Sequence, residues 1–273
     1  MPTKRLLQEV YYSAQAITTL LTLKEVFHLT HRAAEGFVRS IFALLALDLP
    51  VPDHTTLSRR AQTLPVALPK KAKGALTIVA DSTGLKIYGE GEWKVRMHGK
   101  SKRRTWCKLH VAVDADSGEL QAVSLTANHS SDAQMSAALL GQIEQPIEQF
   151  ADDGAYDKRK VYQALDAHSP QAAVLIPPRK GARIWQQGNT KAERHKRDEN
   201  LRYVRKHGKR AWKKQSGYHV RSAGETAMFR LKSIFGDSLC ARLQTTQTTQ
   251  ALIRCAALNR MTHLGMPASY PVA

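Results

Sequence analysis

Two aspartates, Asp81 and Asp153, each follow an apolar run and precede a turn that contains glycine. Asp81 comes after residues 76–80 (LTIVA), and Asp153 follows the apolar segment that ends at residue 151. Mg²⁺ prefers octahedral coordination by oxygen, so carboxylates at the ends of neighbouring buried strands are suitable ligands for it. Each residue is also compatible with an ordinary turn aspartate that binds no metal.

A third acidic residue, Glu225, lies in a segment with helical periodicity. If residues 218–235 form one helix at about 100° per residue, one narrow face holds four polar side chains: Tyr218, Arg221, Glu225 and Lys232. An apolar stripe lies roughly opposite: Val220, Ala227, Leu231 and Ile234. One face is then suited to packing and the other to chemistry. The alternative is a solvated ion pair between Arg221 and Glu225 at spacing i, i+4.

The elements around these residues indicate a mixed α/β core. Short apolar runs predict strands at residues 76–80, 109–113, 120–125, 150–151 and 172–176. A turn at residues 114–118 joins the second and third of them into a hairpin. Helical patterns follow at residues 132–145 and 158–168. The order is strands first, and then helix and strand in alternation.

The N-terminal part, residues 1–74, is predicted to be a separate helical region that ends in a linker. Helical periodicity runs over residues 6–47, residues 49–53 (LPVPD) break it, and residues 54–60 form a short helix with two arginines, Arg59 and Arg60. This order is compatible with a helix-turn-helix that docks on DNA, and equally with a hairpin that only packs. Residues 75–273 then form the second region.

The charge of the chain favours a polyanionic partner. Its 273 residues include 41 Lys and Arg against 23 Asp and Glu, which gives a formal net charge of +18. Residues 158–217 and 94–108 are the two strongly basic stretches, and they flank a net-acidic block. The runs are either solvated faces or surfaces that neutralise nucleic-acid phosphates. Candidate phosphate contacts in them are Lys100, Arg103, Arg104, Arg179 and Lys180.

Four tryptophans lie in or beside these basic stretches: Trp93, Trp106, Trp185 and Trp212. Each is either a packing residue or a platform on which an unpaired base could stack, and Trp185 and Trp212 are the candidates for a flipped base.

Several other classes of protein are excluded. No apolar stretch reaches the roughly 18 to 20 residues that a bilayer span needs, and the first nine residues lack the apolar run of a signal peptide. The three cysteines form no CxxC pattern, which argues against a zinc site or a disulfide framework. We therefore expect a soluble intracellular protein whose cysteines serve in packing.

The motifs resemble those of the bacterial insertion-sequence transposases with a DDE catalytic triad, of the insertion-sequence-five type. Residues 81–86 (DSTGLK) with 89–93 (GEGEW) are similar to the first-Asp motif, and residues 108–110 (KLH) to the next block. Residues 153–157 (DGAYD) are similar to the second-Asp motif, and residues 176–179 (IPPR) to a later signature. Tyr218, Arg221, Glu225 and Lys232 fit the pattern Y-x2-R-x3-E-x6-K, and the resemblance runs from about Ser13 to the C-terminus.

This resemblance implies an RNase H-like mixed-sheet catalytic core with an N-terminal helical DNA-binding region. Asp81, Asp153 and Glu225 would bind two Mg²⁺ ions, for which Mn²⁺ can substitute. Arg221 and Lys232 would bind phosphates, and Tyr218 would orient a backbone group. Residues 177–217 would be a basic insertion before the last catalytic helix. Asp152 stands beside Asp153, and only the DGAYD pattern assigns the ligand role to Asp153.

The implied activity is DNA transposition. The partners would be double-stranded DNA, as terminal inverted repeats and as target, and a second copy of the chain in a homodimer or higher assembly. A cytoplasmic, nucleoid-associated protein with no membrane partner is expected. Because related chains often begin with a further N-terminal segment, a truncated DNA-binding relic is one alternative. Another RNase H-like nuclease or recombinase is the second.

Overall fold

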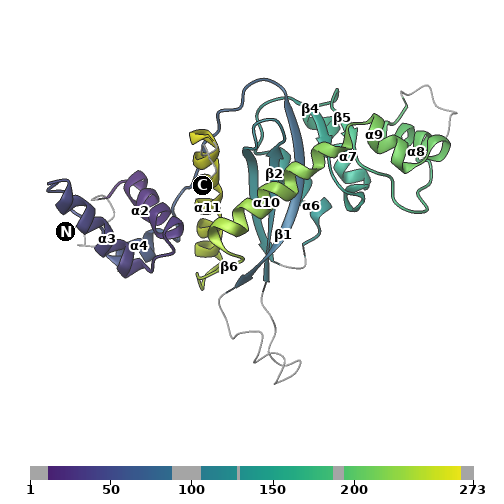
Figure 1. Cartoon of the computed structure of the whole chain (residues 1–273). Helices are drawn as coiled ribbons and strands as arrows, with labels where there is room; N and C mark the ends of the chain where they lie inside the picture. The colour runs from purple at the N-terminus through teal and green to yellow at the C-terminus, as the bar shows by residue number, and fades with distance from the viewer. Residues whose placement is uncertain (1–11, 88–105, 128–129, 187–193, 266–273) are drawn as a thin grey trace, which may run out of the picture. The chain divides into compact units, whose positions relative to one another are not determined.

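The computed structural model describes residues 12–87, 106–127, 130–186 and 194–265 (Figure 1). The chain forms two compact units, each built from separate stretches of sequence. The first unit comprises Met1–Pro69, Leu85–Trp106 and Leu231–Met261. The second comprises Lys70–Gly84, Cys107–Arg230 and Thr262–Ala273.

The N-terminal helices of the first unit are α2 (Ala14–Val26), α3 (His31–Leu44) and α4 (His54–Arg60). The continuous helical pattern predicted for residues 6–47 is interrupted, because His28 adopts a positive φ of 53° and Thr30 caps the N-terminus of α3. The short helix predicted at residues 54–60 is confirmed. Asp53 caps it by accepting hydrogen bonds of 2.8 Å from the backbone N–H groups of Thr55 and Thr56.

A C-terminal helix, α11 (Gln244–Leu264), contributes Ile253 to the apolar core of the same unit. A buried ion pair ties α11 to α2, since Arg254 Nε lies 2.6 Å from Glu25 Oε2. Gln250 also donates to both oxygens of Glu25 at 3.1 Å. The strand β6 (Ser238–Leu239) pairs with the far end of β1 at Lys86 and Ile87.

The second unit is built on a mixed sheet of five strands in the order β3-β2-β1-β4-β5. Their bounds are β1 Leu76–Ile87, β2 Trp106–Asp114, β3 Leu120–Ala127, β4 Ile147–Ala151 and β5 Ala173–Leu175. β2 and β3 form the predicted antiparallel hairpin, whereas β1 pairs with β4 and β4 with β5 in parallel. This arrangement confirms the predicted mixed α/β fold of RNase H-like type.

Alternation along β1 separates the two faces of this sheet. Ile78 and Ala80 belong to the core beneath the helices α6 (Asp132–Leu140) and α7 (Arg159–His168). Val79 faces the other way and packs with Val220 and Ala223. These two residues come from the 3-10 turn η3 (Tyr218–Arg221) and the helix α10 (Ser222–Phe235), which crosses the sheet in Figure 1.

Some sequence-based bounds were wrong. β1 does not end before Asp81 but continues to Ile87, so Asp81 lies within the strand. The helix predicted over residues 132–145 ends at Leu140, and the helix predicted over residues 218–235 is a 3-10 turn followed by an α-helix. The buried face of α10 is therefore centred on Gly224, Met228 and Leu231.

The cysteine prediction was correct for Cys107 and Cys255, which are buried, and wrong for Cys240, which is exposed.

The basic segment before α10 folds back onto the core of the second unit. It contains α8 (Lys196–His207) and α9 (Lys209–Gln215). Arg197, only 3% exposed, donates to Asp157 at 2.7 and 3.2 Å and to Asp198 at 3.2 Å. Asp157 is the last residue of the DGAYD motif, so this motif also anchors the segment. In the described residues, this buried network is the main polar link between α8 and the motif.

The tryptophans of this segment serve in packing. Trp212 is 2% exposed, and its indole N–H donates to Asn200 Oδ1 at 3.0 Å. The ring of Trp185 lies against Tyr162 and His195, and the guanidinium of Arg197 lies 4.0 Å from its centroid. A flipped base could not stack on Trp212 without unfolding this part of the chain, so the packing interpretation holds for it.

We predict that Arg197→Met destabilises the protein by about 3–5 kcal/mol, because it leaves the buried Asp157 and Asp198 without their counter-charge. The free energy of unfolding in urea measures this. Arg202→Met, on the exposed side of the same helix, is the matched control and should change stability by less than about 0.5 kcal/mol. Equal effects of the two substitutions would show that the buried pair does not anchor α8.

Candidate active site

The second unit brings the three sequence-predicted carboxylates to one end of the β1–β4 pair. Val79 of β1 and Ala151 of β4 are partners in the parallel register. Asp81 and Asp153 each stand two residues beyond that pair, at equivalent positions of chains about 4.8 Å apart. Glu225 comes from the first turn of α10, which covers this face. The convergence of Asp81 and Asp153 thus follows from the strand register.

Gly224 brings the third carboxylate close. A Cβ atom built on Gly224 would lie 3.0 Å from Val79 Cγ1, 3.1 Å from Asp81 Cβ and 3.5 Å from Asp81 Oδ2. The first two distances are shorter than normal carbon–carbon contacts, so glycine lets α10 lie this close to β1 without displacing the side chains of Val79 and Asp81. Glu225 is the next residue and is thereby held beside Asp81. The sequence analysis missed Gly224. Its only sequence signal is a pair of small residues directly before the glutamate.

The electrostatics show that the three carboxylates act on one another. Burial raises the pKa of Asp81, while the Ser82 backbone N–H, which donates to Asp81 Oδ1 at 2.8 Å, and the charge of Arg221 oppose that rise. The negative charges of Glu225 and Asp153 raise the same pKa further. A half-buried carboxylate beside two others is a place where positive charge is favoured.

Arg221 partly supplies that positive charge. Its Nη1 donates to Oε1 of Glu225 in a short ion pair, which confirms the i, i+4 pairing considered from the sequence. Its Nε is buried and has no hydrogen-bond partner among the described residues. The pKa of Tyr218 is raised to about 12, mainly by burial and further by the negative charges of Asp152, Asp153 and Glu225. These effects outweigh the positive charge of Arg221, which lowers the same pKa. Tyr218 is therefore a neutral hydrogen-bonding group at physiological pH.

The donor set fits a divalent cation, because it consists of three carboxylates with hard oxygen atoms. In the described ranges, no three His, Cys, Asp or Glu side chains are arranged so as to hold a metal ion as they stand. Two of the three carboxylates are engaged in other contacts. Glu225 is turned to Arg221, and Asp153 Oδ1 accepts a hydrogen bond of 2.6 Å from the backbone N–H of Ala155.

Asp152 has a different environment from its neighbour Asp153. It is 1% exposed, its Oδ1 accepts from the Asp153 backbone N–H at 2.7 Å, and its Oδ2 has no hydrogen-bond partner in the described part of the chain. Burial raises the pKa of Asp152 well above its usual value, and the charge of Asp153 adds to this. Asp152 is thus an interior group, and Asp153 is the more accessible of the two.

A polar network that was not predicted from the sequence supports the part of β1 around Asp81. Asp132, the first residue of α6, lies 2.7 Å from Lys108 Nζ and 3.3 Å from the Nδ1 of the buried His110. Burial opposes ionisation of Asp132, yet hydrogen bonds from Lys108 and Ser82 hold its pKa below the usual value. Ser82 follows Asp81 directly, so α6 and β2 help to fix this part of β1.

The residues predicted to contact DNA have varied surroundings. Lys100, Arg103 and Arg104 lie outside the described residues. Arg179 donates to the carbonyl oxygens of Gly154 at 2.8 Å and Ala155 at 2.5 Å, so its guanidinium holds the second-Asp motif. Lys180 is exposed.

In the first unit, Arg59 is exposed, whereas Arg60 donates to the Tyr12 carbonyl at 3.0 Å. Lys232 lies two turns beyond Glu225 on α10, and its charge helps to lower the pKa of Asp237, behind the larger effect of the hydrogen bond from Lys86. The DNA contacts of all these residues stay predictions.

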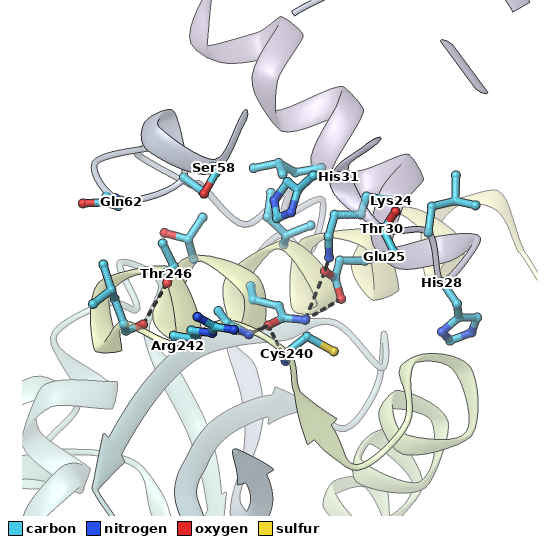
Figure 2. Close-up of a pocket in the computed structure, with 18 residues that line it drawn as sticks. Lys24, Glu25, His28, Thr30, His31, Ser58, Gln62, Cys240, Arg242 and Thr246 are labelled. Atoms are coloured by element: carbon cyan, nitrogen blue, oxygen red, sulfur yellow. Dashed lines mark hydrogen bonds and ion pairs between the residues drawn. The ribbon is translucent and has the colours of Figure 1, made fainter. Parts of the chain in front are cut away.

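The first unit has a cavity of about 640 Å³ between α2, α11 and the turn before α3 (Figure 2). Its floor holds the Glu25 network, in which Lys24 and Gln250 bind the carboxylate. Its rim carries basic and hydroxyl side chains, among them His31, Ser58 and Arg242.

In the part of the chain that the structure describes, none of the helices is both long and apolar enough to pass through a membrane. Comparison with protein families gives two matches, both described as a transposase DDE domain. One covers residues 2–90 and the other residues 72–260, which is well over half of the chain. The second match contains Asp81, Asp153 and Glu225. This chain therefore belongs to the family of transposases with a DDE domain.

Proposed function

We propose that this protein cuts DNA at the terminal inverted repeats of an insertion sequence and joins the freed 3′-hydroxyl ends to target DNA. The observation that carries the proposal is the convergence of Asp81, Asp153 and Glu225 in the second unit, with Gly224 packed on Asp81. Family membership supports the same activity.

Asp81, Asp153 and Glu225 would hold two Mg²⁺ ions, for which Mn²⁺ can substitute. When bound, such ions activate the attacking oxygen and stabilise the leaving oxygen. In the first reaction, water attacks the phosphorus, the bond to the 3′-oxygen breaks, and a 3′-hydroxyl is released. In the second, that hydroxyl attacks a target phosphodiester, forms a new bond to phosphorus and displaces a target 3′-hydroxyl. Neither reaction needs a covalent bond to the protein.

The remaining residues bind and orient the DNA. Arg221 would leave Glu225 when the glutamate turns toward the cations, and its guanidinium, with a buried Nε that has no hydrogen-bond partner among the described residues, would then donate to phosphate oxygens. Tyr218 would donate a hydrogen bond from its hydroxyl group to a backbone oxygen of the DNA. Further phosphate contacts would come from basic residues elsewhere in the chain: Lys232, Lys180, Arg179, Arg59, Arg60, Lys100, Arg103 and Arg104. Because transposition joins two ends, a homodimer or larger assembly on double-stranded DNA is expected.

Cleavage of a linear duplex that carries the element's own terminal repeats tests this function. The purified protein should release 3′-hydroxyl ends at the repeat boundary when Mg²⁺ or Mn²⁺ is present, and chelation with EDTA should abolish the products. A duplex with one repeat replaced by random sequence should be cut at least about tenfold more slowly. Equal cutting of both substrates would favour a general RNase H-like nuclease, and binding without any cutting would favour a truncated DNA-binding relic.

A further inference from the structure

A large aromatic side chain on α10, the helix that carries Glu225, is exposed to solvent. Phe229 of α10 is 72% exposed. Within the described residues, no aromatic ring or cation is recorded against it, unlike Trp185 and Trp212 in the same unit. Single exposed apolar residues are common on protein surfaces, so exposure alone means little. The position of Phe229 relative to the carboxylates is the observation that indicates a role for it.

Helix geometry places Phe229 next to Glu225. Four residues correspond to a rise of about 6 Å and a rotation of about 40°, so the two side chains lie one above the other on the same face. Gly224, Ala227 and Met228, which are buried, lie on other sides of the helix. Phe229 is therefore directed away from the packed side of α10 and shares an exposed face with Glu225, whose side chain is 63% exposed.

The flank of α10 in the second unit suits a DNA strand. A shallow hollow of about 280 Å³ there is lined by two hydroxyl residues of the helix, Ser222 and Thr226, and by Arg230. Hydroxyl and guanidinium groups are common phosphate contacts. Glu225 is the only acidic residue of α10. Arg230 follows Phe229 directly in the chain, and although its guanidinium also donates to Thr262 Oγ1 at 3.1 Å, its charge is complementary to a nucleic-acid backbone.

We propose that Phe229 packs against the face of a nucleobase next to the scissile phosphate and so fixes the strand end beside Glu225. Phosphates follow one another about 3.4 Å apart along the axis of a B-form strand, so a group 6 Å from the glutamate reaches a base within two nucleotides. The partner that Phe229 contacts is the DNA strand on which the carboxylates act. This inference rests on the proposed function. Phe229 is a substrate-positioning residue with little sequence preference, because every base offers a stacking face.

The test measures DNA binding without metal, in EDTA, so that it does not depend on cleavage. The probe is a repeat-end duplex with 2-aminopurine at one of the two nucleotides flanking the cleavage position. We expect Phe229→Ala to weaken binding of this end by about tenfold to a hundredfold and to reduce fluorescence quenching, while Phe229→Trp retains both. Leu264→Ala removes another exposed apolar side chain and should leave both unchanged.

An abasic site at the same nucleotide provides a second criterion. If Phe229 packs against that base, Phe229→Ala should weaken binding of the abasic duplex by less than about twofold, because the contact is already absent. The proposal would be overturned if Phe229→Ala bound the intact duplex as tightly as the wild-type protein does. It would also be overturned if the losses of affinity caused by Phe229→Ala and by the abasic site were fully additive. A shift toward monomer in sedimentation with unchanged DNA binding would also overturn it, and would assign Phe229 to a contact with a second copy.

The outcomes separate this inference from the proposed function. If the wild-type protein fails to cut paired repeats but quenching still depends on Phe229, the transposition chemistry fails and the base contact stands. If cutting occurs and quenching is independent of Phe229, the base contact fails and the function stands.

Discussion

Replacing Asp81 or Asp153 with asparagine, or Glu225 with glutamine, should slow cleavage at the repeat ends by about a thousandfold or more. Each substitution removes one anionic oxygen ligand from a site whose charge stabilises the transition state, and about 4 kcal/mol of lost stabilisation corresponds to this factor. The initial rate of 3′-hydroxyl formation at saturating Mg²⁺ and Mn²⁺ measures it.

Folding and DNA binding should change little in these variants. Asp81 is half-buried and its pKa is already raised by burial, so asparagine removes a charge that the fold does not favour. Glu148→Gln is the matched control, since Glu148 is an exposed carboxylate on β4, the strand that precedes Asp153. Full activity in any one of the three variants would remove that residue from the ligand set.

Gly224→Val should lower the cleavage rate nearly as much, and Gly224→Ala should lower it by about tenfold to a hundredfold. The added Cβ atom would approach Val79 Cγ1 to 3.0 Å and Asp81 Cβ to 3.1 Å, so these side chains or the helix must give way by a few tenths of an ångström, and the larger side chain of valine requires more. A displacement of about 1 Å in an active site can reduce the rate by a hundredfold. The overpacking should cost only about 1–3 kcal/mol of stability, so the fold should survive.

The helical glycine Gly36 provides the comparison. It lies in α3, and a Cβ atom built on it meets nothing within 4 Å. Gly36→Ala should therefore leave cleavage unchanged and stabilise the protein by up to about 1 kcal/mol. The readouts are the rate at saturating DNA and metal, and the affinity for repeat-end DNA in EDTA. If Gly224→Ala cuts at the wild-type rate, the close approach of α10 to β1 does not position Glu225.

Both the strand pattern and the family could be predicted from the sequence, whereas the roles of the acidic residues stay predictions. Apolar runs mark buried strands because a strand covered on both faces needs apolar side chains throughout. The order of those runs predicted the mixed sheet, and the motifs around Asp81, Asp153 and Glu225 predicted the DDE transposase family, which the family matches confirm. These features are local in the chain, or depend on spacing within one motif.

The positions of the functional side chains depended on contacts between distant segments. Residue-by-residue patterns could not show that β1 runs on through Asp81, because β6, more than 150 residues later, pairs with its far end. Nor could they show that Arg179 turns to the backbone of the second-Asp motif. Gly224 has a role only because Val79 and Asp81 lie beneath it.

The sequence by itself determined which chemical groups this protein carries and in which kind of secondary structure they stand, since periodicity and residue type are properties of neighbouring positions. Only the tertiary structure decided which groups meet. It buried Trp212, turned Arg179 to the backbone of the second-Asp motif, left Phe229 exposed to solvent and brought Gly224 against Asp81. The physical reason is that close packing fixes side-chain surroundings through contacts between residues far apart in the chain.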